Sequence, residues 1–198
     1  TLSSSSAASD VYKRQVYTVA ELRVKVTIEK EQVKEQPTTP QPSDTTVAQP
    51  PKNGDVIADD KTKAKFEVTD VTKKEVTYHA PITIKAKTIT IPATIKINGE
   101  IYKVTKIDKN ALKGNKKVTK IVVGSNIQSI GDYAFSGCKK LKTIIIQSKK
   151  LTTKTVSKKA FKGIAKKVVV KVPKKKRTAY KKLLKKKGLS SKNRIKNY

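Results

Sequence analysis

Apolar and polar residues alternate along the chain from Ala64 to the middle of the sequence. The segments AKFEV, EVTYHA and KTITIPATIKI change character at about every second residue, which predicts short strands with one buried face. Asn98-Gly99 then separates ATIKI from EIYKV, and both residues accept the positive φ angles of a type I′ turn. We therefore expect β-hairpins over residues 55–106.

The residues before this region do not continue its pattern. VYTVAELRVKVTI predicts one strand, which cannot fold alone, so we interpret residues 16–36 as the remnant of an upstream β domain. Residues 37–54 are rich in Pro and Thr and predict an extended linker. Residues 1–15 share no pattern with the rest and are interpreted as a non-native or disordered tail. The N-terminus has no apolar segment of the kind a signal peptide needs, so either the protein stays inside the cell or the chain is a fragment that lacks its true start. Thr1 in place of an initiator Met favours the fragment.

A repeat replaces this alternation after residue 106. Three segments contain Ala, a large apolar residue, one variable residue and Gly, and their alanines are 23 and 26 residues apart. They lie at residues 111–114, 134–137 and 160–163. A short β-rich segment follows each of them. In these strands the side chains expected to point inward are Ile121 and Val123, Ile144 and Ile146, and Val168 and Val170.

A period in the low twenties with one strand per unit is typical of leucine-rich repeats. The pattern I-G-x-x-A-F-x-G-C-x-x-L-x-x-I runs from Ile130 to Ile144 and resembles the BspA-type leucine-rich repeats of bacterial surface proteins. This resemblance covers about residues 86–198. It implies an α/β repeat fold, a short β-rich leucine-rich-repeat solenoid. It also implies a non-enzymatic role in adhesion or protein binding, at the cell surface or outside the cell.

The end of the chain is expected to cap this solenoid, because a terminal repeat has an apolar flank to hide. KKKRTAYKKLLKKKGL places Tyr180, Leu183 and Leu184 on one face of a helix, and Gly188 is a typical helix stop. The expected parts are therefore capping hairpins (55–106), the repeats (107–173) and a basic C-terminal capping helix and tail (174–198). No apolar segment is long enough for a transmembrane helix, and we expect a monomer.

The net charge of +31 is distributed unevenly along the chain. Asp132 is the last carboxylate, and residues 133–198 contain 24 Lys or Arg and no Asp or Glu. Only four of the basic residues in the chain are Arg, the residue on which base recognition usually depends. We therefore expect diffuse, salt-sensitive attraction to polyanions and no sequence-specific nucleic-acid binding. One hypothesis follows directly: a retention module whose lysines hold anionic wall polymers.

Residues for catalysis are scarce. His79 is the only histidine and ends a predicted strand, so we expect a surface or structural role for it. Cys138 is the only cysteine and aligns with Asn115 and Ile164, which predicts a packing role. The repeats lack the two carboxylates that most glycosidases use. The glycines occur singly, so no Gly-rich phosphate-binding loop is expected. We expect no enzymatic activity, no cofactor and no metal site. An active domain upstream of residue 16 is a further hypothesis.

The exposed face of the predicted sheet is the candidate binding surface. Val122, Ile145 and Val169 would form an apolar stripe bordered by lysines, a composition typical of protein-binding surfaces. The alternative is that β-branched residues occupy these positions only because they favour strands. Expected partners are host or cell-surface macromolecules. The predicted partner-binding residues are Lys120, Val122, Thr143, Ile145, Gln147, Lys167, Val169 and Lys171, with Gly124 on the same face.

Overall fold

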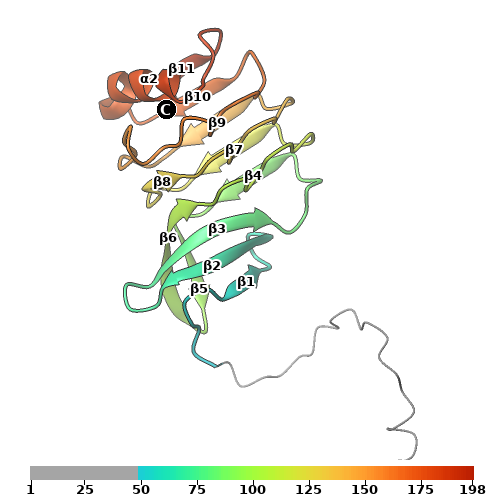
Figure 1. Cartoon of the computed structure of the whole chain (residues 1–198), viewed down its shortest axis with the longest axis vertical. Coiled ribbons are helices and arrows are strands. Elements are labelled where there is room, and N and C mark those ends of the chain that lie inside the picture. The colour runs from blue at the N-terminus through green and yellow to red at the C-terminus, as the bar shows by residue number, and fades with distance from the viewer. Residues whose placement is uncertain (1–48) are drawn as a thin grey trace, which may run out of the picture. The chain divides into compact units, whose positions relative to one another are not determined.

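The computed structural model describes residues 49–198, which belong to one compact unit. The expected tail at 1–15, the β remnant at 16–36 and the linker up to residue 48 lie outside the described residues. The described part consists mostly of strands in two sheets, with one short α-helix. None of its helices is long and apolar enough to cross a membrane. Figure 1 shows its strands stacked one above another along the longest axis.

The first sheet contains the hairpin that the sequence predicts. Its strand order is β1-β2-β3-β6-β5, and β8 pairs with β6. Its strands are β1 (Val56–Asp59), β2 (Ala64–Asp70), β3 (Glu75–Pro81), β5 (Thr94–Ile97), β6 (Glu100–Ile107) and β8 (Ser129–Ile130). β5 and β6 are antiparallel around Asn98 and Gly99, whose φ angles of 50° and 82° are those the predicted turn requires. Phe66 and Tyr78 fill the inner face of this sheet.

The second sheet is parallel throughout and consists of one strand from each coil of the chain. Its order is β11-β10-β9-β7-β4. The strands are β4 (Thr88–Ile91), β7 (Lys120–Val123), β9 (Thr143–Ile146), β10 (Val169–Val172) and β11 (Arg194–Asn197). The six side chains predicted to point inward from β7, β9 and the β10 segment are all buried. The predicted inner face is therefore confirmed.

The segments with the Ala-x-x-Gly pattern stack into a second line beside this sheet. The backbone N–H of Leu112 donates to the carbonyl of Ala134 at 2.7 Å, and that of Phe135 donates to the carbonyl of Ala160 at 3.0 Å. The rings of Phe135 and Phe161 lie beneath this ladder with their centroids 5.4 Å apart, and both are fully buried. Each coil therefore forms hydrogen bonds with the backbone of the next one and covers its apolar side chains.

Gly137 and Cys138 show how closely the coils approach each other. Gly137 has a φ angle of 75°, and a Cβ atom there would lie 3.3 Å from the Cα atom of Gly114 in the preceding coil. Cys138 is buried, and its Sγ–H donates to the carbonyl of Leu112 at 3.2 Å. Burial raises the pKa of the Cys138 thiol to about 11. A buried, protonated thiol is unreactive, which agrees with the predicted packing role.

The C-terminal segment forms the 3-10 turn η1 (Lys174–Lys176) and the helix α2 (Arg177–Lys186). Tyr180, Leu183 and Leu184 are buried, so the predicted apolar face of the helix is confirmed. The Tyr180 hydroxyl donates to the carbonyl of Ser148 at 2.9 Å and accepts from the N–H of Leu151 at 3.1 Å. These two bonds connect α2 to the turn that follows β9.

The expected C-terminal tail is in fact part of the sheet. Gly188, with a φ angle of 96°, ends the helix as predicted, and β11 then pairs in parallel with β10. A Cβ atom on Gly188 would lie 3.5 Å from the carbonyl of Lys158, so this glycine stacks on the preceding coil. Helix and strand together form one more coil. The sequence of β11, RIKN, gives no alternation signal, and its strand forms because the edge of β10 offers unpaired backbone groups.

The ordered region also differs from the prediction at its N-terminal side. β4 lies where only hairpins were expected, yet it pairs in parallel with β7. Residues of the predicted linker also make contacts with the first sheet. The N–H of Gly54 donates to the carbonyl of Val68 at 2.7 Å, and Nδ2 of Asn98 donates to the carbonyl of Gln49 at 3.1 Å. The folded region therefore includes residues that Pro and Thr content alone assigns to a linker.

Candidate functional site

The outer face of the parallel sheet carries two rows of side chains. In one row lie Thr88, Lys120, Thr143, Val169 and Arg194; in the other lie Thr90, Val122, Ile145, Lys171 and Lys196. All ten residues are exposed or half-buried. Neighbouring members of a row are about 4.8 Å apart, the strand spacing of a sheet, so a partner would contact several of them at once.

The register corrects the predicted apolar stripe. Val122 and Ile145 lie side by side, as expected, but Val169 pairs with Thr143 and belongs to the other row. The residue beside Ile145 is Lys171. The prediction placed Val169 beside Val122 and Ile145, which lie 11 residues after Ala111 and Ala134. The residue 11 positions after Ala160 is Lys171, so the distance from the alanine of each repeat gives the observed register.

The remaining predicted residues flank the sheet. Gln147 follows β9 and Lys167 precedes β10, and both are exposed. Gly124, in contrast, is buried, because the backbone of Pro92 and Ala93 lies 2.6 Å from the position of an added Cβ atom. Gly124 is therefore a point of close backbone approach and is not available to a partner.

The chemistry of the face changes along the stack. Its centre is apolar, with the half-buried Val122 and Ile145. Its C-terminal end is cationic, with Lys171, Arg194 and Lys196 on β10 and β11. None of the ten residues is acidic. A partner that matches this face would present an apolar group next to anionic ones.

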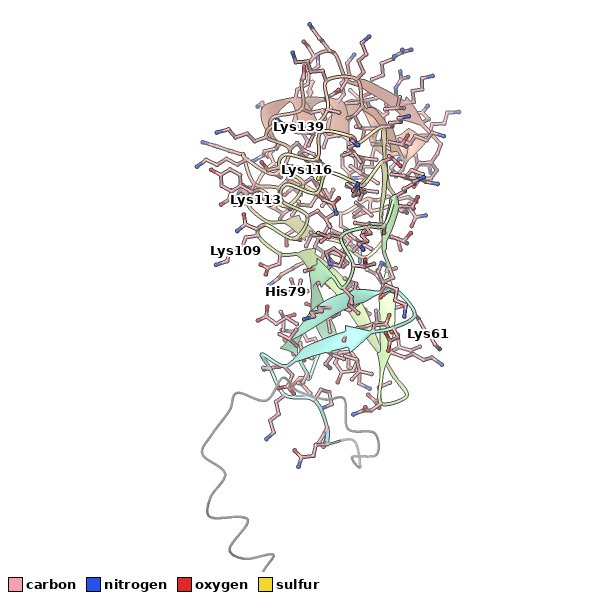
Figure 2. The ribbon with its side chains drawn as sticks, turned by 90° about the vertical axis from the view of Figure 1, so that its right-hand side faces the viewer. Lys61, His79, Lys109, Lys113, Lys116 and Lys139 are labelled. Carbon is pink, nitrogen blue, oxygen red and sulfur yellow. The ribbon has the colours of Figure 1, made fainter. Side chains whose placement is uncertain are left out.

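Lysines also form columns on the side of the stack where the Ala-x-x-Gly turns lie. Because Gly114 and Gly137 stack, the residues two positions after them, Lys116 and Lys139, occupy the same place in successive coils. Figure 2 shows Lys109, Lys113, Lys116 and Lys139 following one another along the long axis. The four ion pairs within residues 49–198 all lie between Asp60 and Asp108, so no lysine after Asp108 has an acidic partner in the described part.

A polar groove of about 460 Å³ lies beside β6 and β8, and sequence reasoning missed it. Its lining includes Glu67 of β2, Asp108 after β6 and Asp132 after β8. His79 lies next to it, with Nδ1 3.0 Å from Oδ2 of Asp108. The sequence gives no sign of this cluster, because Glu67, His79 and Asp108 are separated by 12 and 29 positions and meet only through strand pairing.

The repeat that forms the parallel sheet matches a known family. Residues 105–196 match the model of the BspA type leucine rich repeat region, in six copies. These residues are BspA-type leucine-rich repeats. Such repeats are consistent with a protein-binding or surface module, and nothing in the match indicates catalysis. No match was found among curated proteins.

Among solved structures, three bacterial proteins are similar to the chain. A leucine-rich repeat protein from Bacteroides capillosus ATCC 29799 has 19% identity and a TM-score of 0.39, over 59% of this chain and 71% of that one. A leucine rich cell surface protein from Faecalibacterium prausnitzii A2-165 has 18% identity and a TM-score of 0.42, over 72% of this chain and 32% of that one. A leucine-rich repeat protein from Bacteroides ovatus ATCC 8483 has 23% identity and a TM-score of 0.42, over 56% of this chain and 35% of that one. The chain thus spans about a third of the last two, and the assignment rests on the repeats alone.

Proposed function

We propose that residues 49–198 form a non-enzymatic binding module of a surface or secreted protein, which holds a protein partner on the outer face of its parallel sheet. The observation that carries this proposal is the apolar pair Val122 and Ile145 at the centre of the face, with Thr90 on one side, the half-buried Lys171 on the other and no carboxylate on the face. An apolar centre with a charged rim is the composition of protein-binding surfaces. The role we propose is adhesion to a host or neighbouring cell.

The proposal includes the architecture of the stack, a short solenoid covered at both ends. At the N-terminal end, β3 pairs with β6, and the first sheet covers this end of the stack. At the C-terminal end, α2 buries Tyr180, Leu183 and Leu184 and leaves its lysines in solvent. Covered ends favour a soluble array whose one long face is free for a partner.

The lysine columns favour a second function, retention on an anionic wall polymer. Lys116 and Lys139 repeat at the spacing of the coils and have no acidic partner in the described part. The next coil has Ala165 at this place, so a linear polyanion that follows the stack would meet these cations in two successive coils. Its binding would weaken steeply with salt.

One experiment separates these functions. The fluorescently labelled chain is incubated with intact epithelial cells and with purified bacterial cell walls. Ile145→Lys places a charge in the centre of the candidate face and should weaken binding to cells by about tenfold or more. Ile101→Lys is the matched control, because Ile101 is 57% exposed but lies on β6, in the other sheet. Proteinase treatment of the cells should abolish binding if the partner is a protein.

The outcomes are distinct for the two candidates. Binding to cells that is lost in Ile145→Lys and retained in Ile101→Lys supports the protein-binding face. Binding to walls that resists Ile145→Lys but falls sharply between about 50 and 200 mM salt supports wall retention instead. Equal binding of all three chains to cells would contradict the role of the sheet face.

A further inference from the structure

We propose that Glu67, His79 and Asp108 form a binding site for a divalent transition metal ion, for which zinc is the natural probe. One ligand atom from each residue lies within 4.8 Å of the other two. The chain contains a single histidine, and the fold places it between two carboxylates. Figure 2 shows His79 at the foot of the lysine column, below Lys109.

Strand pairing brings the three residues together. Tyr78 of β3 pairs with Ile107 of β6, and the N–H of Asp108 donates to the carbonyl of Tyr78 at 2.9 Å. Asp108 therefore lies directly beside His79. Glu67 pairs with Thr77, two residues before His79 on the same strand. The three side chains thus belong to adjacent positions on the outer face of three neighbouring strands.

A β-bulge directs the histidine toward the carboxylates. In the pairing of β2 with β3, Lys65 is opposite Ala80 and Phe66 is opposite Tyr78, so His79 is the extra residue. Bulges of this kind change the direction of a side chain and are frequent beside functional sites. His79 is 44% exposed on its side chain and Asp108 is 26% exposed, so an ion can reach both without unfolding the sheet.

The two carboxylates of the cluster are not engaged by a lysine. Three other carboxylates of the described part do pair with lysines: Asp60 with Lys63, Asp70 with Lys73 and Glu100 with Lys74. Glu67 takes part in none of the four ion pairs of residues 49–198, and Asp108 pairs only with His79. Neither carboxylate thus has a lysine partner, although lysines line the same groove, and both oxygens remain available to an ion.

The ligand set and its dimensions fit zinc. An imidazole nitrogen and carboxylate oxygens are ligands that zinc accepts, whereas calcium and magnesium prefer oxygen alone. Two ligands of one tetrahedral zinc ion are about 3.3 Å apart, given bonds of about 2.0 to 2.1 Å. The 3.0 Å between His79 Nδ1 and Asp108 Oδ2 is close to that distance, and a carboxylate oxygen of Glu67 lies within 4.8 Å of the ligand atoms of both. Three protein ligands leave at least one coordination position open for water or for a group of a partner.

The test is a titration of the full chain, freed of metal with a chelator, with Zn²⁺ in a calorimeter. We expect one ion per chain, together with a higher melting temperature, because the ion connects β2, β3 and β6. His79→Ala, Asp108→Asn and Glu67→Gln should each weaken binding by about tenfold or more. Asp60→Asn is the matched control, because that carboxylate is exposed and is not one of the three proposed ligands, so this variant should bind zinc like the parent chain.

A second measurement keeps the test independent of variant stability. Co²⁺ bound at the proposed site should give visible absorption bands that His79→Ala removes while circular dichroism confirms an unchanged fold. The absence of zinc binding would overturn the proposal. Binding of several ions per chain that persists in His79→Ala would overturn it as well, because the ions would then be held elsewhere.

Discussion

The two sheets of the protein differ in how they use charge. Eight of the nine carboxylates in residues 49–198 precede residue 109, and all four ion pairs lie in that first region. From Tyr133 to the end the chain has no carboxylate at all. The first region therefore neutralises part of its charge internally, whereas the repeats keep their cations for solvent or for a partner.

The two regions also differ in how their backbones are paired. The pairing of β2 with β3 contains register shifts, and so does that of β3 with β6. The pairs β4–β7 and β7–β9 run without a shift. The repeats therefore depend on residues that recur at fixed places, and the first sheet depends on individual contacts. Substitutions of the same kind in the two regions should have different effects.

Phe161→Ala should have the largest effect, because it removes a fully buried ring that packs on Phe135. We expect a loss of about 3 to 5 kcal/mol in the free energy of unfolding, measured by urea denaturation. Since each coil contacts mainly its neighbours, hydrogen exchange should show lost protection in β9 and β10 and retained protection in β2 and β3. An equal loss of protection in both sheets would remove the distinction between the two regions.

Gly137→Ala tests the close approach of the coils, and Gly99→Ala is its control. Both glycines have positive φ, so each substitution introduces backbone strain of about 1 kcal/mol. At Gly137 the new Cβ would also press on the backbone of Gly114, whereas at Gly99 no atom lies within 4 Å. We therefore expect a loss of about 2 to 3 kcal/mol for Gly137→Ala and about 1 kcal/mol for Gly99→Ala in thermal unfolding. Equal losses would show that the coils move apart at low cost.

Removing one buried hydroxyl from each region should destabilise the protein in the C-terminal region only. Tyr180→Phe loses both bonds of a buried hydroxyl and leaves the N–H of Leu151 without its partner, at a cost of about 1 to 2 kcal/mol. The hydroxyl of Tyr78 is buried and has no hydrogen-bond partner within the described residues, and burial raises its pKa. Tyr78→Phe should therefore leave stability unchanged or raise it by up to about 1 kcal/mol. Destabilisation by Tyr78→Phe, seen in the same denaturation assay, would mean that the hydroxyl is solvated.

The fold of the repeats could be predicted from the sequence because it depends on local, recurring signals. The alanines, glycines and inward apolar residues recur at intervals of 23 and 26, and Asn98-Gly99 marks the hairpin. β11 could not be predicted, because its strand is formed by the edge of β10 and not by a pattern of its own. The place of Val169 was predicted wrongly for another reason: it was aligned with Val122 and Ile145 by its apolar character, whereas the distance from the alanine of each repeat places Lys171 beside Ile145.

The candidate sites show the same limit. Val122 and Ile145 could be predicted as neighbours because each lies 11 residues after the alanine of its repeat, Ala111 or Ala134. The cluster at His79 was not predicted, because the bulge that directs the histidine and the pairing that brings Asp108 beside it involve three separate strands. Contacts between distant strands carry no periodic signal in one sequence.

The parallel ladder also determines how the protein responds to force. The C-terminus lies with α2 and β11 at one end of the stack, and β1 and β5 lie at the other (Figure 1). Tension between these ends runs along the inter-strand hydrogen bonds, so it loads them one coil at a time instead of shearing a whole strand at once. The four-residue strand β11 would detach first, followed by β10. A chain pulled from its two ends would therefore lengthen in steps of one coil. It would unfold gradually, whereas a sheet loaded in shear would unfold in one event.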